Sequence, residues 1–339
     1  MKTLSNRYIL VSGALCAGLA LIPANVLAQS KVKPRLIPGP ELTGPIVGGI
    51  QPPSNEIPGQ TNRPADPAYG AYQRGFYLTA LQLALPRAES GDPAAQTLIA
   101  EIYWHGLGVA RDAKQALEWY RFAAQGGNRS AQFAYANILL RGQLVETDLK
   151  AGKEMMKKAA DAGHARAQFN YAQMITAERP TFASFKKALP WYEKAAEAGI
   201  ADAQYALANI YAEAKGVLHN DEKKARAWLR RAAANGLDTA QLEYGIWLAN
   251  GKGGPRDSKR ALVWLQRAAT QGNISAQNRI AHAYFSGVGT SLDEVKGGAW
   301  HIIARRSGFN DTELERRFAA LKPIDKKRAL TLANRLKPR

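Results

Sequence analysis

Seven glycines recur along this chain at an almost constant spacing. Five of the six gaps between them are 36 residues and one is 37; the glycines are Gly91, Gly127, Gly163, Gly199, Gly236, Gly272 and Gly308. A period of this length is typical of a repeat array, in which each unit buries its apolar face only by stacking on its neighbours. The spacing therefore predicts an α/α solenoid, an architecture better suited to binding other molecules than to catalysing their reactions.

Each unit begins with the same dipeptide. Ala-Gln follows the repeat glycine by four and five residues in all six units: Ala95-Gln96, Ala131-Gln132, Ala167-Gln168, Ala203-Gln204, Ala240-Gln241 and Ala276-Gln277. Apolar residues at offsets 4, 8, 11 and 12 from the glycine form one stripe on a helix. The residue at offset 9 is always Ala or Gly. We therefore expect a first helix with a buried stripe and one close helix contact.

A second helix is predicted in the latter part of each unit. Fifteen residues before the next repeat glycine stands a residue type that caps helix N-termini: Asp112, Asp148, Ser184, Asp221, Asp257 and Asp293. Eight residues before that glycine stands a bulky side chain: Trp119, Met155, Trp191, Trp228, Trp264 and Trp300. We interpret this row as core, and the alternative is an aromatic ladder for sugars or cations.

The units have atypical neighbours at both ends. Residues 67–90 are predicted to form a single unpaired leading helix. After the last repeat glycine, two shorter helices are expected at about 311–321 and 325–336, with Asp311 and Asp325 as their N-caps. Repeat arrays need such ends to cover the last apolar face.

The first 28 residues have the features of a cleaved secretory signal peptide. Lys2 and Arg7 form a basic start, residues 8–22 are apolar, and small residues precede a predicted cleavage site after Ala28. This apolar run is shorter than the roughly 20 residues that a spanning helix needs, and a retained anchor is the alternative. The single cysteine, Cys16, lies in this segment. An exported chain without disulfides favours a bacterial periplasm.

The chain after the signal peptide divides into three parts. Residues 29–69 contain nine prolines and no apolar periodicity, which predicts a disordered linker. The repeat solenoid is expected over 70–308, and the capping helices with a basic tail over 309–339. The formal net charge of the whole chain is +18, a surplus that favours acidic partners.

The combined pattern resembles the Sel-one-like repeat, a relative of the tetratricopeptide repeat. Its signature is Gly-x-x-x-Ala-Gln, then Tyr-x-x-Gly-x-Gly-Val, Asp, Lys-Ala-x-x-Trp and Ala-Ala-x-x-Gly, which residues 103–109 and 114–120 match well. The resemblance covers about residues 70–308. It implies an all-α fold, a right-handed superhelix of about six helix-turn-helix repeats, that serves as a protein-interaction scaffold. Exported bacterial members include regulators of envelope signalling and factors in exopolysaccharide or cell-wall assembly.

The sequence contains no catalytic, metal or cofactor motif. No two of its five histidines stand at metal-ligand spacing within one helix, and there is no phosphate-binding loop or nucleophile elbow. Glu101 and Asp112 could form an acid/base pair, but Asp112 is better explained as a helix cap. The recurring Gln is also interpreted as structural, because a catalytic amide would be needed in one unit, whereas this Gln occurs in all six. We therefore expect a protein that is not an enzyme and uses no cofactor.

Two positions on each first helix point away from the buried stripe, at offsets 6 and 10. In three adjacent units they pair a ring with a side-chain amide: Phe133 with Asn137, Phe169 with Gln173, and Tyr205 with Asn209. In related arrays these helices line a concave groove, so the six residues are candidate contacts for an extended peptide. The alternative is that the rings pack against the helix of the next unit.

The second helices are rich in Lys and Arg. The candidates for a basic face are Lys157, Lys158, Lys223, Lys224, Arg230 and Arg231. Because the chain is predicted to be exported, an acidic protein or an anionic glycan is a better partner for this face than nucleic acid, and no membrane span is expected after signal cleavage.

Three functions follow, in decreasing order of support. The first is a non-enzymatic periplasmic scaffold or envelope regulator that binds a protein in the groove. The second is an adaptor that binds exopolysaccharide or cell wall through the basic face. The third is an envelope hydrolase.

Overall fold

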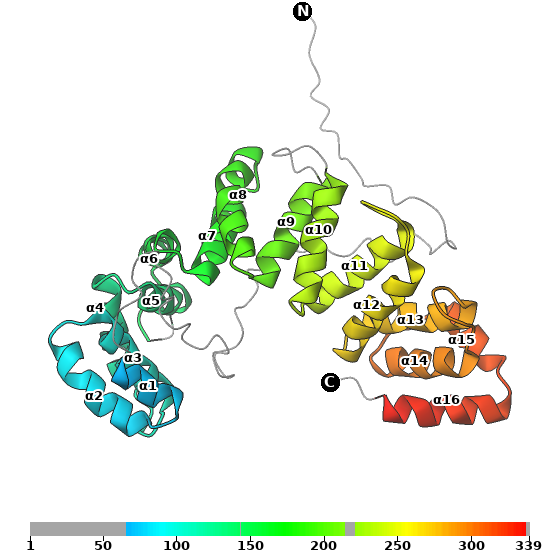
Figure 1. Cartoon of the computed structure of the whole chain (residues 1–339), viewed down its shortest axis with the longest axis horizontal. Helices are drawn as coiled ribbons and strands as arrows, with labels where there is room; N and C mark the ends of the chain where they lie inside the picture. Colours follow the sequence, from blue (N-terminus) through cyan, green and yellow to red (C-terminus); the bar gives the residue numbers. More distant parts are fainter. Residues whose placement is uncertain (1–65, 143, 214–220, 337–339) are drawn as a thin grey trace, which may run out of the picture. The chain divides into compact units, whose positions relative to one another are not determined.

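The computed structural model describes residues 66–142, 144–213 and 221–336, and every regular element within them is an α-helix (Figure 1). The helices are α1 Pro67–Gln73, α2 Tyr77–Glu89, α3 Pro93–His105, α4 Ala113–Gln125, α5 Arg129–Arg141, α6 Leu149–Asp161, α7 Ala165–Glu178, α8 Phe182–Glu197, α9 Ala201–Glu213, α10 Glu222–Ala234, α11 Asp238–Asn250, α12 Ser258–Thr270, α13 Ile274–Ser286, α14 Glu294–Arg306, α15 Thr312–Ala319 and α16 Pro323–Arg335. The predicted signal peptide and most of the predicted linker lie outside the described residues.

Helices that follow one another in the sequence pack against one another. From α3 to α14 they form six pairs, each a first and a second helix, and each second helix also contacts the first helix of the next pair. Contacts between neighbouring units are the defining property of a solenoid. The prediction of an all-α solenoid of six helix pairs is confirmed.

The small residue at offset 9 is needed where the two helices of a pair meet. Ala100, Ala136, Ala172 and Ala281 have no exposed surface. In the fifth unit a Cβ added at Gly245 would lie 2.9 Å from Cγ of Leu265 on the paired helix. Such positions tolerate no larger side chain without moving a helix.

The recurring glutamine fastens each first helix to the second helix before it. Its side-chain Nε2 donates a hydrogen bond to a backbone carbonyl eight residues earlier, in the last turn of that preceding helix. The six bonds join Gln96 to Ala88, Gln132 to Ala124, Gln168 to Ala160, Gln204 to Ala196, Gln241 to Ala233 and Gln277 to Ala269. All six glutamines are buried. Because the last carbonyls of a helix have no partner within it, this glutamine latch explains why Gln occurs in every unit.

Most predicted helix caps are confirmed. The carboxylates of Asp112, Asp148, Asp221, Asp257 and Asp293 each accept a backbone N–H at the start of a second helix. The prediction for Ser184 was wrong, because Thr181 caps α8 and Ser184 completes a capping box with it. The prediction for Asp325 was also wrong, because α16 starts two residues earlier, at Pro323, a residue type that fits the first turn of a helix.

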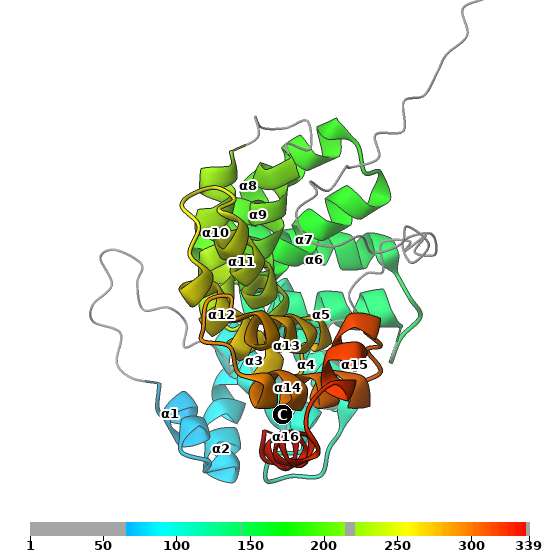
Figure 2. The ribbon, with the colours of Figure 1, turned by 90° about the vertical axis from the view of Figure 1, so that its right-hand side faces the viewer.

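The two ends of the array differ from their predictions in detail. Residues 67–90 form two helices, α1 and α2, which pack on each other, because Gly75 adopts a φ of +81° and ends the first helix. At the other end, α15 contacts α13 and α14, and α16 packs along α14 (Figures 1 and 2). The predicted pair of short closing helices is present.

The bulky row that was predicted to be core packs within or against the core in every unit. Of its six side chains only Trp300 is buried, whereas the other five are half-buried. The residue that follows each of these five is the one that is buried: Tyr120, Met156, Tyr192, Leu229 and Leu265. The buried stripe of the second helix is thus rotated by one residue from the predicted one.

Candidate binding surfaces

The three aromatic candidates on the first helices are packed within the array to different degrees. Phe169 is buried and meets the ring of Tyr192 edge-on, with 6.0 Å between centroids. Phe133 is half-buried and stacks on the imidazole of His164, the N-cap residue of the next first helix, α7, with 4.4 Å between ring centroids. Phe169 is therefore part of the core, and one face of the Phe133 ring is in contact with the His164 imidazole.

Tyr205 is also half-buried and is joined to the following repeat. Burial, followed by the nearby carboxylate of Glu243, raises the pKa of Tyr205 to about 12. Its hydroxyl interacts with Glu243 on α11 and with the Asn209 side chain on its own helix. Tyr205 therefore keeps its proton at neutral pH and can serve as a hydrogen-bond donor.

The amides beside these rings are not equally available. Asn137 donates to the carbonyl of Phe133 on its own helix at 2.9 Å, and Asn209 interacts with Tyr205. The Gln173 side chain, half-exposed on α7, makes no hydrogen bond to any described residue. Of the three candidate amides, Gln173 is the one whose donor and acceptor are both open to a ligand.

The same repeat positions are occupied at both ends of the array. In the first unit the Glu101 carboxylate, at offset 10, lies 3.2 Å from Nε2 of His105 and interacts with the Tyr120 hydroxyl. In the last unit Asn278 and His282 both contact Asp311 of the closing segment, at 3.1 and 2.9 Å. Between these two units, Gln173 on α7 is the candidate on this face whose side chain keeps both its donor and its acceptor open.

Asp311 fastens the closing helices to the last repeat. Burial alone would raise its pKa, but hydrogen bonds from His282, the Leu314 backbone and Asn278 lower it to about 2. Between about pH 2 and pH 3.8 the Asp311 carboxylate is therefore ionised in the folded chain. In the unfolded chain, where its pKa has the ordinary value of 3.8, it is protonated.

We expect wild-type stability to fall by about 2 kcal/mol as the pH drops from about 4 to about 2, because a depressed pKa contributes stability only above the unfolded value. Asp311→Asn keeps a residue suited to the N-cap and should lack this part of the pH dependence. Urea unfolding at a series of pH values would measure the difference. An equal fall in the variant would contradict the assignment.

The six basic candidates are all exposed, and they differ in their partners. Lys157 pairs with Asp161 at 2.7 Å, Lys224 lies 3.8 Å from Asp221, and the Arg231 guanidinium covers the ring of Trp228. Lys158, Lys223 and Arg230 make no ion pair or hydrogen bond with a described residue. Exposed pairs of this kind contribute little to stability, so these cations are available to a ligand.

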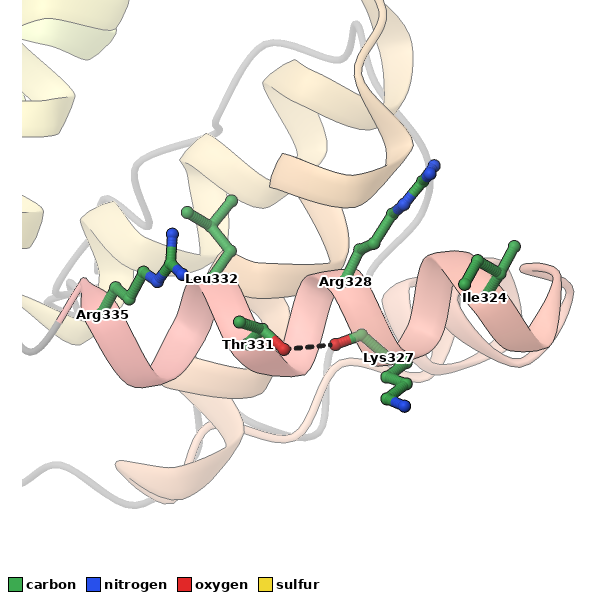
Figure 3. Close-up of a pocket in the computed structure, with 6 residues that line it drawn as sticks. All are labelled: Ile324, Lys327, Arg328, Thr331, Leu332 and Arg335. Carbon is green, nitrogen blue, oxygen red and sulfur yellow. Dashed lines mark hydrogen bonds between the residues drawn. The ribbon is translucent and has the colours of Figure 1, made fainter.

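A shallow hollow of about 410 Å³ runs along α16. Its lining residues, drawn in Figure 3, are Ile324, Lys327, Arg328, Thr331, Leu332 and Arg335. All six come from one helix at spacings of three and four residues, and Thr331 Oγ1 donates to the Lys327 carbonyl at 3.0 Å. Side chains of a single helix do not enclose a small molecule, so this hollow is a surface feature.

In the described part of the chain, no group of three or more His, Cys, Asp or Glu side chains is arranged to hold a metal ion. The same residues include no helix that is long and apolar enough to cross a membrane. Asp112, the residue that could have formed an acid/base pair with Glu101, accepts the Gln115 backbone N–H at 2.9 Å as a helix cap.

One residue with a perturbed ionisation was not singled out from the sequence. His164 follows a repeat glycine and caps α7, its Nδ1 accepting the Ala167 backbone N–H at 3.2 Å. Burial, and then the charges of Arg129 and Arg166, lower the pKa of His164 to about 4. Asp92, Asn128 and Asn273 occupy the same repeat position as helix caps, and this shared position was the signal that could have identified it.

Comparison with known families decides what this array is. The model of the Sel1 repeat matches six consecutive segments: residues 93–128, 129–164, 165–200, 201–237, 239–273 and 274–309. The chain belongs to the Sel1 repeat family. Sel1 repeat proteins generally act as protein-interaction scaffolds. No curated protein matches the sequence.

Two solved structures resemble this Sel1 repeat chain. One is a protective antigen present in uropathogenic Escherichia coli strains and displaying an SLR fold, with a TM-score of 0.66 and 29% identity over 79% of this chain. This chain covers 60% of the length of that antigen. The other is a Sel1 repeat protein from Oxalobacter formigenes, with a TM-score of 0.62, 28% identity, and coverage of 71% of this chain and 98% of that one.

Proposed function

We propose that this Sel1 repeat protein is a non-enzymatic scaffold of a bacterial periplasm that holds an extended segment of a partner protein along α5, α7 and α9. The proposal is supported by the scaffold role that is general in the family. The signal-peptide features of residues 1–28 support export, and the absence of cysteine after Cys16 fits the periplasm.

The observation that carries the binding site is the open amide of Gln173. It lies in the third of the six units, between the two units that carry the half-buried Phe133 and Tyr205 at offset 6 of their first helices. An amide that both donates and accepts can bond the backbone of an extended peptide, whose own N–H and C=O groups need partners.

The test uses the tagged full-length chain, recovered from the periplasmic extract after crosslinking in cells. Gln173→Ala should reduce the amount of captured partner about fivefold to tenfold, the effect of losing one or two buried hydrogen bonds. Gln115→Ala, an exposed amide on the second helix α4, is the matched control and should capture as the wild type does. Equal capture by all three proteins would exclude this face, and recovery of the chain from another compartment would exclude the location.

A second candidate function, an adaptor for an anionic envelope polymer, is favoured by the net charge of +18. Long-range attraction of this kind weakens as salt is added.

A further inference from the structure

Three consecutive second helices carry the same pairing of an indole with a cation. In α8, α10 and α12 a half-buried tryptophan is followed three residues later by an exposed Lys or Arg that lies over its ring. The distances to the ring centroid are 4.9 Å for Lys194 on Trp191, 4.6 Å for Arg231 on Trp228 and 4.5 Å for Arg267 on Trp264. The indole row is therefore a set of platforms for cations.

A second cation stands four residues before each of these tryptophans. These residues are Lys187, Lys224 and Arg260, and all are exposed. Residues at i−4, i and i+3 share one face of a helix, so each helix presents cation, ring and cation in line. We call the three copies together the tryptophan–cation face. The first unit lacks the full set, because Gln115 and Phe122 stand at these positions around Trp119 in α4. The second unit lacks it because Met155 replaces the tryptophan in α6.

The ring holds its cation in place without using its hydrogen-bond donors. A guanidinium stacked on an indole contacts it with its flat face, which leaves the N–H groups at its edge free. Two of the three rings are themselves held by a neighbouring ring: Tyr171 meets Trp191 edge-on, and Tyr244 meets Trp264 edge-on, each with 5.5 Å between centroids. A cation fixed in this way loses less conformational freedom when it binds an anion.

The cations that stand three residues after each tryptophan have no competing anion among the described residues. No ion pair joins Lys194, Arg231 or Arg267 to a described carboxylate. Of the cations that stand four residues before a tryptophan, two lie near the carboxylate that caps their own helix. Lys224 lies 3.8 Å from Asp221, and Arg260 lies 3.3 Å from Asp257. Exposed pairs at such distances are weak, so an incoming anion can displace them.

We propose that the tryptophan–cation face binds a linear polysaccharide that carries carboxylates at regular intervals. Three equal subsites, one in each repeat, match a ligand that itself repeats, whereas the surface of a folded protein does not. Guanidinium groups bind carboxylates through paired hydrogen bonds. Single-stranded nucleic acid fits less well, because it binds by stacking its bases on open rings, and here the rings are covered by cations. The proposal rests on the second candidate function, an adaptor for an anionic polymer. It is independent of the proposed peptide site on α5, α7 and α9, because this face lies on the second helices.

The experiment measures binding of the full-length chain to polygalacturonate, with a neutral polysaccharide and a single-stranded DNA as comparisons. The triple variant Lys194→Gln, Arg231→Gln, Arg267→Gln should bind polygalacturonate at least about tenfold more weakly, the combined loss of three exposed charge contacts. The matched control is Lys114→Gln, Lys186→Gln, Lys259→Gln. It removes the same charge from exposed positions on second helices that belong neither to the tryptophan–cation face nor to the six basic-face candidates.

The proposal is supported if the first triple loses affinity and the control triple stays within about twofold of the wild type, with both variants melting at the wild-type temperature. Equal losses in the two triples would show a general charge effect and overturn it. Absence of wild-type binding, or tighter binding of the DNA than of polygalacturonate, would overturn it as well. Because Gln173 is unchanged in both triples, capture of the protein partner tests the proposed function separately.

Discussion

Gly289→Ala is expected to lower the free energy of unfolding by about 3–4 kcal/mol, from a left-handed backbone and a steric clash together. Gly289 lies in the loop between α13 and α14 with a φ of +75°. A Cβ at this position would overlap the backbone carbonyl oxygen of Ser258, which begins the second helix of the preceding unit. Because the obstacle is backbone, the loop and that helix would have to separate.

Gly272→Ala separates the two contributions to this effect. Gly272 has a φ of +93°, yet a Cβ added there meets no atom within 4 Å. This variant should therefore lose only the backbone part, about 1–2 kcal/mol. Urea unfolding followed by tryptophan fluorescence would compare the two proteins, and similar losses would mean that the loop does not press on the preceding unit.

Acidification is expected to weaken the array through His164. The pKa of His164 is about 4 in the folded chain and 6.5 by its ordinary value, so the unfolded chain binds the proton first as the pH falls. The contribution of His164 to the free energy of unfolding is therefore complete above pH 6.5 and is lost as the pH falls to about 4. The difference of some 2.5 pKa units corresponds to about 3 kcal/mol.

His164→Asn is the control for this prediction. Asn128 and Asn273 cap helices at the same repeat position, accepting backbone N–H groups at about 3.0 Å, so the variant should retain the cap of α7. Its urea midpoint should change less than that of the wild type between pH 7 and pH 4.5. If both proteins weaken equally over this range, another group controls the acid sensitivity.

The fold could be predicted from the sequence because each repeat restates it. Six copies of Ala-Gln and five capping aspartates established the register, and the structure uses them as latches and caps. The errors arose where one unit departs from the others or no repeat is present. Thr181 replaced Ser184 as a cap because the third loop has its own sequence, and Gly75 divides the leading helix outside the repeat pattern.

The candidate surfaces were harder to predict because periodicity locates a helix face only to within about one residue. A rotation of one position, 100° on a helix, moved Leu229 into the core and left Trp228 half-buried. Spacing alone also could not show that Asn137 bonds its own helix while Gln173 bonds no described residue. These distinctions depend on the rotamers and neighbours of single side chains.

The glutamine latch has a consequence for how such an array can change in length. Each latch crosses the junction between two units and joins residues only eight positions apart, so its donor and acceptor recur in register with the repeat. Duplicating or deleting a 36-residue segment such as 238–273 would leave every junction with a glutamine on one side and an alanine carbonyl on the other. A gene encoding this protein can therefore gain or lose whole units by recombination while each new junction closes with the same bond.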